Sequence, residues 1–140
     1  CAVPRPRHPL VPMRGLTLRD VASAGWIAPP AGSVLRHRFE LMFREDGLAP
    51  PIDMVETAAL LFITRMLQQS DMLAVLAADV AHYYAAHGIV SVLPLAMPCR
   101  MDAFGIITRT DQLPSPAAKV MMQALKATSL TLYGRKLEAA

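Results

Sequence analysis

Short apolar runs alternate with longer amphipathic segments along most of this 140-residue chain. Such runs are typical of buried strands, which we expect at 26–28, 52–55, 72–76, 89–93 and 104–108, with the end of another at 2–4. The segments between them keep apolar side chains on one helical face, which predicts helices at 18–23, 34–44, 58–67, 80–87 and 116–127. This alternation favours an α/β fold with a mostly parallel sheet flanked by helices.

Polar residues and glycines mark where these helices begin and end. Side chains that can accept a hydrogen bond from the first turn stand before them as expected caps, namely Thr17, Ser33, Thr57 and Asp79. Ser115 opens the last helix, with a proline at its first position. Gly47 and Gly88 stand where a glycine commonly closes a helix. Residues 131–140 show no strong pattern.

The composition is that of a folded chain, since 54% of the residues are hydrophobic and 18% are charged. No apolar run is long enough for a membrane helix. The net charge of +3 comes with no stripe of basic residues interleaved with aromatic ones, so we expect no nucleic-acid binding by these residues themselves. Cys1 and Cys99 have neither a metal-type nor a redox-type spacing, which favours two reduced thiols in a cytoplasmic protein.

The arrangements that enzymes need are not found in the sequence. The acidic residues follow no motif that would bring two carboxylates into one cleft, and there is no glycine-rich phosphate loop and no nucleophile elbow. His82 and His87 lie on one short helix at a spacing that suits a shared metal ion poorly. We therefore expect that the chain is not an enzyme and holds no metal and no cofactor.

Several local strings, taken in their order, indicate a family. They are HPL at 8–10, LTLRDVASAGWIAPPAGSVLR at 16–36, GLAPPIDMVET at 47–57, MLAVLAADVAHYYAAHGIVSVLPL at 72–95 and FGIITRTDQLPSPAAKVMMQAL at 104–125. Together they cover most of the chain and resemble the substrate-binding domain of bacterial LysR-type transcriptional regulators. One stretch departs from that pattern, because 68–71 reads QQSD where glycines are usual, and Ala77 stands where a proline is common. Asp71 would then either add a polar group to the cleft wall or face solvent.

The resemblance implies a two-lobed fold similar to periplasmic binding proteins, with a small-molecule effector between the lobes. Residues 1–98 would form the second lobe, 99–128 would return to the first lobe, and 129–140 would be a C-terminal tail. The helix-turn-helix that binds DNA would lie upstream, and the start at Cys1 rather than a methionine fits a fragment. A solute-binding protein of a transport system shares the two-lobed plan and is the alternative, which a signal peptide on the parent gene would support.

The helix after Ser33 carries the main candidate for an effector site. Its first turn presents free backbone N–H groups and a partial positive charge, yet its third position is Arg36, where an acidic residue would be favoured. An anion held by Gly32, Ser33 and Arg36 would make this arrangement favourable. The alternative, equally weighted, is a solvated basic face on which Arg36 pairs with Glu40 one turn later.

Thr57 is the second candidate, because ligands in this architecture gather beyond the carboxyl ends of strands. Its hydroxyl could donate a hydrogen bond to a carboxylate or a hydroxyl group, or it could be an ordinary helix cap. The neighbouring Glu56 would repel an anion, which leaves room for a sugar or another polyol beside an organic acid.

Self-association is expected as well. In a complete domain the strand at 104–107 and the apolar side of the last helix, formed by Val120, Met121, Ala124 and Leu125, would pack on the first lobe. Without that lobe, this apolar surface must be buried in another way, and a second copy of the chain could bury it. The resemblance implies a further dimer contact on the helix at 58–67.

Overall fold

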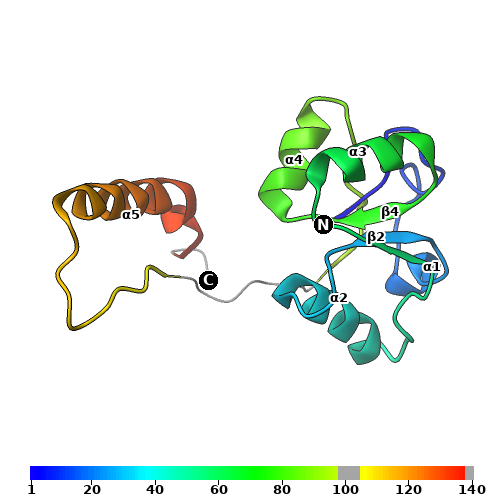
Figure 1. Cartoon of the computed structure of the whole chain (residues 1–140). Coiled ribbons are helices and arrows are strands. Elements are labelled where there is room, and N and C mark those ends of the chain that lie inside the picture. The colour runs from blue at the N-terminus through cyan, green and yellow to red at the C-terminus, as the bar shows by residue number, and fades with distance from the viewer. Residues whose placement is uncertain (98–104, 138–140) are drawn as a thin grey trace. The chain divides into compact units, whose positions relative to one another are not determined.

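The computed structural model describes residues 1–97 and 105–137 (Figure 1). The chain divides into two compact units, Cys1–Met101 and Asp102–Ala140. The first unit contains the strands β1 (Ala2–Val3), β2 (Trp26–Ala28), β3 (Met54–Glu56) and β4 (Leu73–Val75). It also contains the helices α1 (Leu18–Val21), α2 (Val34–Glu45), α3 (Leu60–Gln69) and α4 (Ala78–Ala86). The second unit contains α5 (Pro116–Leu137).

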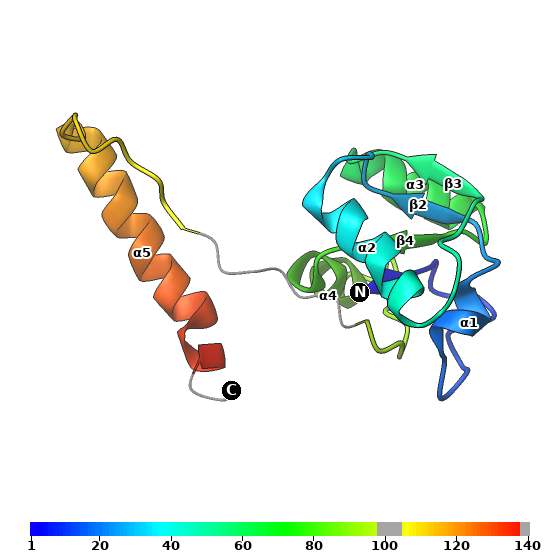
Figure 2. The ribbon, with the colours of Figure 1, turned by 90° about the horizontal axis from the view of Figure 1, so that it is seen from below.

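The strands form one sheet in the order β1-β4-β2-β3. β2 runs parallel to both β3 and β4, whereas β1 runs antiparallel to β4. The carboxyl ends of β2, β3 and β4 therefore meet at one edge of the sheet, and each of these strands leads into the helix that follows it (Figure 2). The mostly parallel sheet with flanking helices confirms the predicted fold class.

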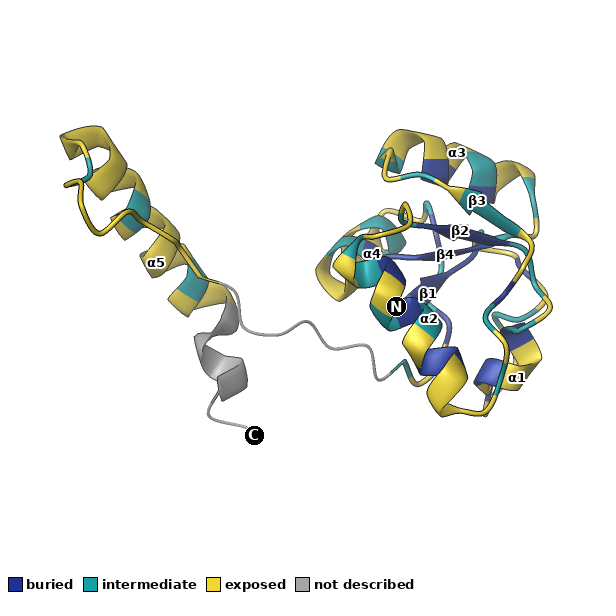
Figure 3. Ribbon diagram, turned by 60° about the horizontal axis from the view of Figure 1, so that its bottom comes forward, coloured by how far each residue is buried: buried dark blue, intermediate teal, exposed yellow. Residues whose placement is uncertain are grey.

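Helices cover both faces of the sheet because successive strand residues point to opposite sides. Trp26 and Leu73 face α1 and α2 in one apolar cluster, and Ile27 and Ala74 face α3 and α4 in the other. In Figure 1, α3 and α4 lie above the strands and α2 lies below them. Figure 3 shows the buried residues gathered along the strands and the inner faces of the helices. The first unit is thus a helix–sheet–helix sandwich.

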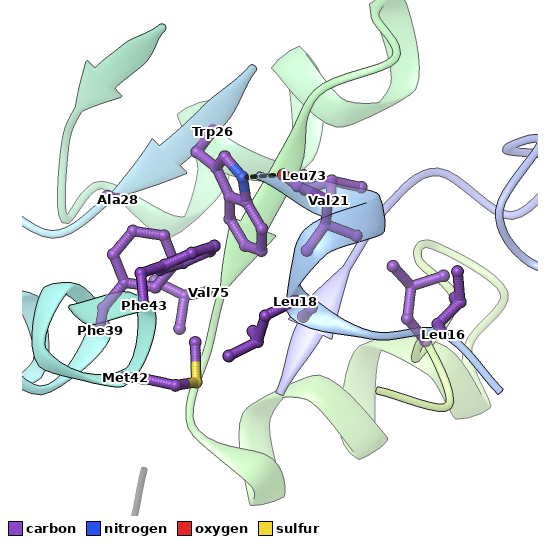
Figure 4. Packing of buried hydrophobic residues seen from close by; sticks show 12 residues of the cluster. Leu16, Leu18, Val21, Trp26, Ala28, Phe39, Met42, Phe43, Leu73 and Val75 are labelled. Carbon is purple, nitrogen blue, oxygen red and sulfur yellow. Dashed lines mark hydrogen bonds between the residues drawn. The ribbon is translucent and has the colours of Figure 1, made fainter. Parts of the chain in front are cut away.

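An aromatic trio anchors α2 to the sheet (Figure 4). The ring centroids of Trp26 and Phe39 lie 4.9 Å apart, and Phe43 meets both rings edge-on at 5.2 and 6.2 Å. The indole nitrogen of Trp26 donates a 3.0 Å hydrogen bond to the carbonyl oxygen of Val21, so its polar atom is satisfied inside the core. This bond also ties the end of α1 to β2.

Most predicted elements are found near their expected places. β1 to β4 and α1 to α4 all begin and end within two residues of their predicted limits, with β3 and α3 displaced toward the C-terminus. Gly47 and Gly88 close α2 and α4 with φ values of +70° and +68°, as a helix-closing glycine requires. The Ser115 hydroxyl accepts a hydrogen bond from the backbone nitrogen of Ala118, which confirms the predicted start of α5.

Two predicted helix caps are wrong. The backbone nitrogen of Thr57 still donates to the carbonyl oxygen of Ala28 on β2, so the chain is extended at Thr57, and α3 begins only after Ala59. Asp79 lies inside the first turn of α4, whose cap position is held by Ala77. A carboxylate in that turn still complements the positive end of the helix.

Two predicted strands are also absent from the described residues. Residues 89–93 run beside β1, with Leu93 donating to Ala2 and Ser91 donating to Pro4, yet they form no regular strand. The prolines at this edge lack the N–H groups that a full ladder needs. Residues 105–108 form no strand and are exposed, and Phe104 lies outside the described residues.

The last helix is longer than predicted. α5 continues to Leu137, through the residues in which no pattern was expected. This stretch contains the helix-favouring Leu132, Arg135, Lys136 and Leu137, and no proline interrupts it. These residues outweigh the unfavourable Gly134 without an amphipathic period. Within the described ranges, no helix is long and apolar enough to cross a membrane.

Candidate functional site

The carboxyl edge of the parallel strands brings together the turns that hold the predicted site residues. The turn after β2 contains Gly32 and Ser33 and leads into α2, and the turn after β3 contains Thr57 and leads into α3. In open α/β sheets this edge is where ligands bind. The structure therefore places both candidate turns at the same edge of the sheet, as the parallel register requires.

Ser33 caps α2 as predicted. Its hydroxyl accepts a 3.2 Å hydrogen bond from the backbone nitrogen of Arg36, and its carbonyl accepts one from His37 at 3.0 Å. Gly32 turns the chain into the helix with φ of +83°, a conformation that side chains other than glycine's rarely allow. The N–H groups of Val34 and Leu35 then have no partner inside the helix, because helix geometry leaves the first turn unsatisfied.

A shallow, open hollow of ≈ 430 Å³ lies against this first turn of α2. It is lined by two residues of the turn and four of the helix, namely Gly32, Ser33, Val34, His37, Arg38 and Leu41. The hollow offers backbone donors, one hydroxyl and two basic side chains. Arg36 is not among its lining residues.

Arg36 points to the other side of the helix, where it joins three elements. Its Nε donates to Glu40 at 2.6 Å, and its Nη1 donates to Glu56 at 2.8 Å and to the carbonyl oxygen of Pro29 at 3.3 Å. Only 11% of its side chain is exposed. The pairing with Glu40 that one interpretation predicted is present, and Glu56 is a second partner that helical spacing could not reveal.

These contacts hold both groups in their charged forms. Burial disfavours the charged guanidinium, but the hydrogen bonds to Glu40 and Glu56 outweigh it and raise the pKa of Arg36. The backbone N–H of Ala31, followed by the side chain of Arg36, lowers the pKa of Glu56. At neutral pH the cluster is therefore an ion-paired network and not an unpaired cation.

Thr57 closes the turn after β3. Its hydroxyl oxygen accepts a 3.1 Å hydrogen bond from the backbone nitrogen of Ala59, two residues later. This bond fixes the short extended segment before α3. Thr57 follows Glu56, so it lies beside the Arg36 network and not among the residues that line the hollow.

Asp71 lies at the opposite edge, just before β4, and belongs to a different group of contacts. Its carboxylate, in a side chain that is 66% exposed, pairs with the guanidinium of Arg5 at 2.8 Å. Its carbonyl oxygen lies 3.1 Å from Nε2 of the buried His8, whose Nδ1 accepts from the backbone nitrogen of Leu10. Asp71 therefore anchors the amino-terminal segment, a role that its place in the sequence did not reveal.

The remaining ionisable candidates suggest no metal centre. His87 packs against Tyr83 with ring centroids 4.4 Å apart, and its Nδ1 lies 2.8 Å from the carbonyl oxygen of Tyr83. In the part of the chain that the structure describes, no three histidine, cysteine or acidic residues gather as metal ligands would.

Comparison with known proteins gives the family. Residues 1–129 match the model of the LysR substrate binding domain. The HTH-type transcriptional regulator GbpR of Azospirillum brasilense is 34% identical over 139 residues, which cover 99% of this chain and 41% of that protein. The HTH-type transcriptional regulator GalR of Pseudomonas putida is 40% identical over 119 residues, which cover 85% of this chain and 30% of that protein.

The chain thus spans less than half the length of these curated relatives. Their names are those of transcriptional regulators and not of transport proteins or enzymes. They therefore favour the regulator over the solute-binding protein of a transport system, which shares the two-lobed plan. The order of sequence motifs, the mostly parallel α/β sheet and the match over residues 1–129 agree with one another. The chain belongs to the LysR substrate binding domain family.

Proposed function

We propose that this chain is the effector-sensing domain of a bacterial transcription regulator, which binds a small polar metabolite and passes the signal to a helix-turn-helix elsewhere in the protein. The family match is the observation that carries the proposal, since its relatives are HTH-type regulators. The proposed action is binding and not catalysis, without metal or cofactor, and in the cytoplasm. Residues 1–98 act as one lobe, 99–128 return to the other, and 129–140 form the tail.

The proposed effector site consists of Gly32, Ser33, Arg36 and Thr57 at the carboxyl edge of the sheet. The open hollow beside the first turn of α2 supports this proposal, as do the backbone donors of that turn. Gly32 and Ser33 contact the effector directly. Arg36, on the other side of α2, and Thr57, in the turn after β3, border the same edge of the sheet.

The function is tested on the full-length protein by a thermal-shift screen with organic acids and sugars. A ligand at about 100 times its Kd stabilises the folded state by about 2.7 kcal/mol. The same ligand must change the affinity of the protein for its target DNA in a gel-shift titration. A ligand that binds tightly and leaves DNA binding unchanged would contradict the proposed signalling role.

The site is tested by titration calorimetry with the ligand found in that screen. Ser33→Ala and Arg36→Ala are each expected to weaken binding about tenfold, which corresponds to the loss of one hydrogen-bonding partner. Ser23→Ala and Arg65→Ala are the matched controls, because both side chains are exposed and neither contacts a residue of the proposed site or of the Arg36 network. Unchanged affinity in Arg36→Ala removes Arg36 from the site.

A further inference from the structure

The charges of the ion-pair network around Arg36 balance one another. Arg36 pairs with Glu40 and Glu56, and Glu40 also accepts a hydrogen bond from Arg44 at 3.3 Å. The network therefore contains two guanidinium groups and two carboxylates. It therefore has no net positive charge with which to neutralise an anion.

The hydrogen-bonding capacity of the same network is not exhausted. Within the described residues, Arg36 donates through Nε and Nη1, while its Nη2 makes no hydrogen bond and is not sealed from solvent. Each carboxylate oxygen of Glu56 accepts one hydrogen bond, although a carboxylate has about four acceptor positions. The Glu56 side chain is 45% exposed. One ion pair thus retains both donor and acceptor capacity.

A hydroxyl group matches this combination because it donates one hydrogen bond and accepts others. A carboxylate ligand only accepts, so it would find Arg36 already neutralised and would lie close to the charge of Glu56. At a separation of about 6 Å in a partly solvated site, that repulsion weakens binding about tenfold. His37 and Arg38 line the hollow on the other side of α2, so an acid bound there is the contrary possibility.

We infer that the effector is a neutral polyhydroxylated molecule of the sugar type, and that Glu56 is the residue that discriminates against acids of the same shape. The inference rests on the proposed function, whose effector class it narrows. Glu56 also positions the turn before α2, since it accepts a 3.3 Å hydrogen bond from the backbone nitrogen of Ala31. One side chain would then both shape the turn and select the ligand.

The test compares sugars with their own acids on the full-length protein. Titration calorimetry with glucose against glucuronate, and with galactose against galacturonate, changes the charge of the ligand and keeps most of its hydroxyl pattern. Citrate and benzoate serve as acids without a sugar frame. At least one neutral sugar is expected to bind, about tenfold more tightly than its uronate.

Glu56→Gln then tests the discriminating residue. Glutamine keeps one acceptor oxygen, which serves either Arg36 or Ala31, and carries no charge, so the preference for the neutral sugar is expected to fall to about twofold or less. Glu45→Gln is the control, because it removes the same charge from the opposite, exposed end of α2 and is expected to leave the preference intact. An unchanged preference in Glu56→Gln removes Glu56 as its source.

The outcomes separate this inference from the function on which it rests. Two results with the wild-type protein overturn the neutral-polyol inference. The first is a uronate that binds as tightly as its sugar, and the second is binding of citrate or benzoate but of no sugar. If such an acid also changes DNA binding, the regulator function stands and only the effector class is wrong. If no compound changes DNA binding and the protein recognises no DNA, the proposed function itself fails.

Discussion

Nη1 of Arg36 lies 2.8 Å from Oε1 of Glu56, so a nearly buried guanidinium on α2 is joined to the last residue of β3. The same nitrogen donates to the carbonyl oxygen of Pro29, directly after β2. Glu56 in turn accepts a hydrogen bond from Ala31. The turn that leads into the proposed effector site is therefore held at two points by one ion pair.

Arg36→Ala is expected to lower the free energy of unfolding by about 1–3 kcal/mol, because it leaves Glu40, Glu56 and Pro29 without their shared donor. Arg44→Ala breaks a more exposed pair at 3.3 Å and is expected to cost less than about 1 kcal/mol. Urea denaturation measures both values. Equal losses in the two variants would show that Arg36 does not hold the turn.

Stability should depend on the ionisation of Glu56. Hydrogen bonds from Ala31 and then Arg36 place its pKa in the folded state below the ordinary value of 4.5. A lowered folded-state pKa means that this stabilisation is fully present above pH 4.5 and is lost as the pH falls through the folded-state value. The stability difference between the wild type and Glu56→Gln is therefore expected to be constant near neutral pH and to shrink in acid. A pH-independent difference in urea titrations would contradict the assignment.

Trp26 reports on the aromatic trio because it is the single tryptophan of the chain. Phe39→Ala removes a fully buried ring beside it and is expected to cost about 3–5 kcal/mol. Phe62→Ala deletes a ring that is 51% exposed on α3 and is expected to change stability by about 0.5 kcal/mol. Unfolding followed by Trp26 fluorescence distinguishes them, and similar midpoints would contradict the observed packing.

His8 should contribute to stability through both ring nitrogens. Since Nδ1 accepts from Leu10, the proton lies on Nε2 and is donated to Asp71. His8→Ala is expected to cost about 1–3 kcal/mol and to speed hydrogen exchange at the backbone N–H of Leu10. The exposed His82→Ala is the control. Unaltered exchange at Leu10 would argue against the assigned tautomer.

Self-association of the 140-residue chain is expected from the apolar surface of α5. Val120, Met121 and Leu125 are 66%, 61% and 52% exposed, which is unusual for clustered large apolar side chains. Light scattering is expected to detect dimers or larger species. The double variant Met121→Glu, Leu125→Glu is expected to shift these species toward monomer. Leu61→Glu on α3 tests the other contact that the resemblance implied. A monodisperse wild-type monomer would refute the expectation.

Local sequence signals were sufficient for the elements whose limits depend on local chemistry. β2 and α2 were predicted because an apolar run, a serine cap and a closing glycine act over a few residues. The start of α3 was not, because Thr57 remains bonded to Ala28 on a neighbouring strand. The Arg36–Glu56 pair was beyond sequence reasoning for the same reason. It exists because the parallel register sets Glu56 opposite Ala28, and this register is a property of the assembled sheet.

The pairing of β1 bears on how the domain folds. Ala2 and Val3 lie against Val75 and Ala74, and Cys1 bonds with its amino group to the carbonyl oxygen of Leu76. β1 must therefore wait until β4, much later in the chain, has been synthesised before the two strands can pair. Closing so long a loop costs entropy that only the finished sheet repays, so folding should be slow and late in synthesis. Until then this edge of the sheet is open to chaperones and to mispairing with other nascent chains.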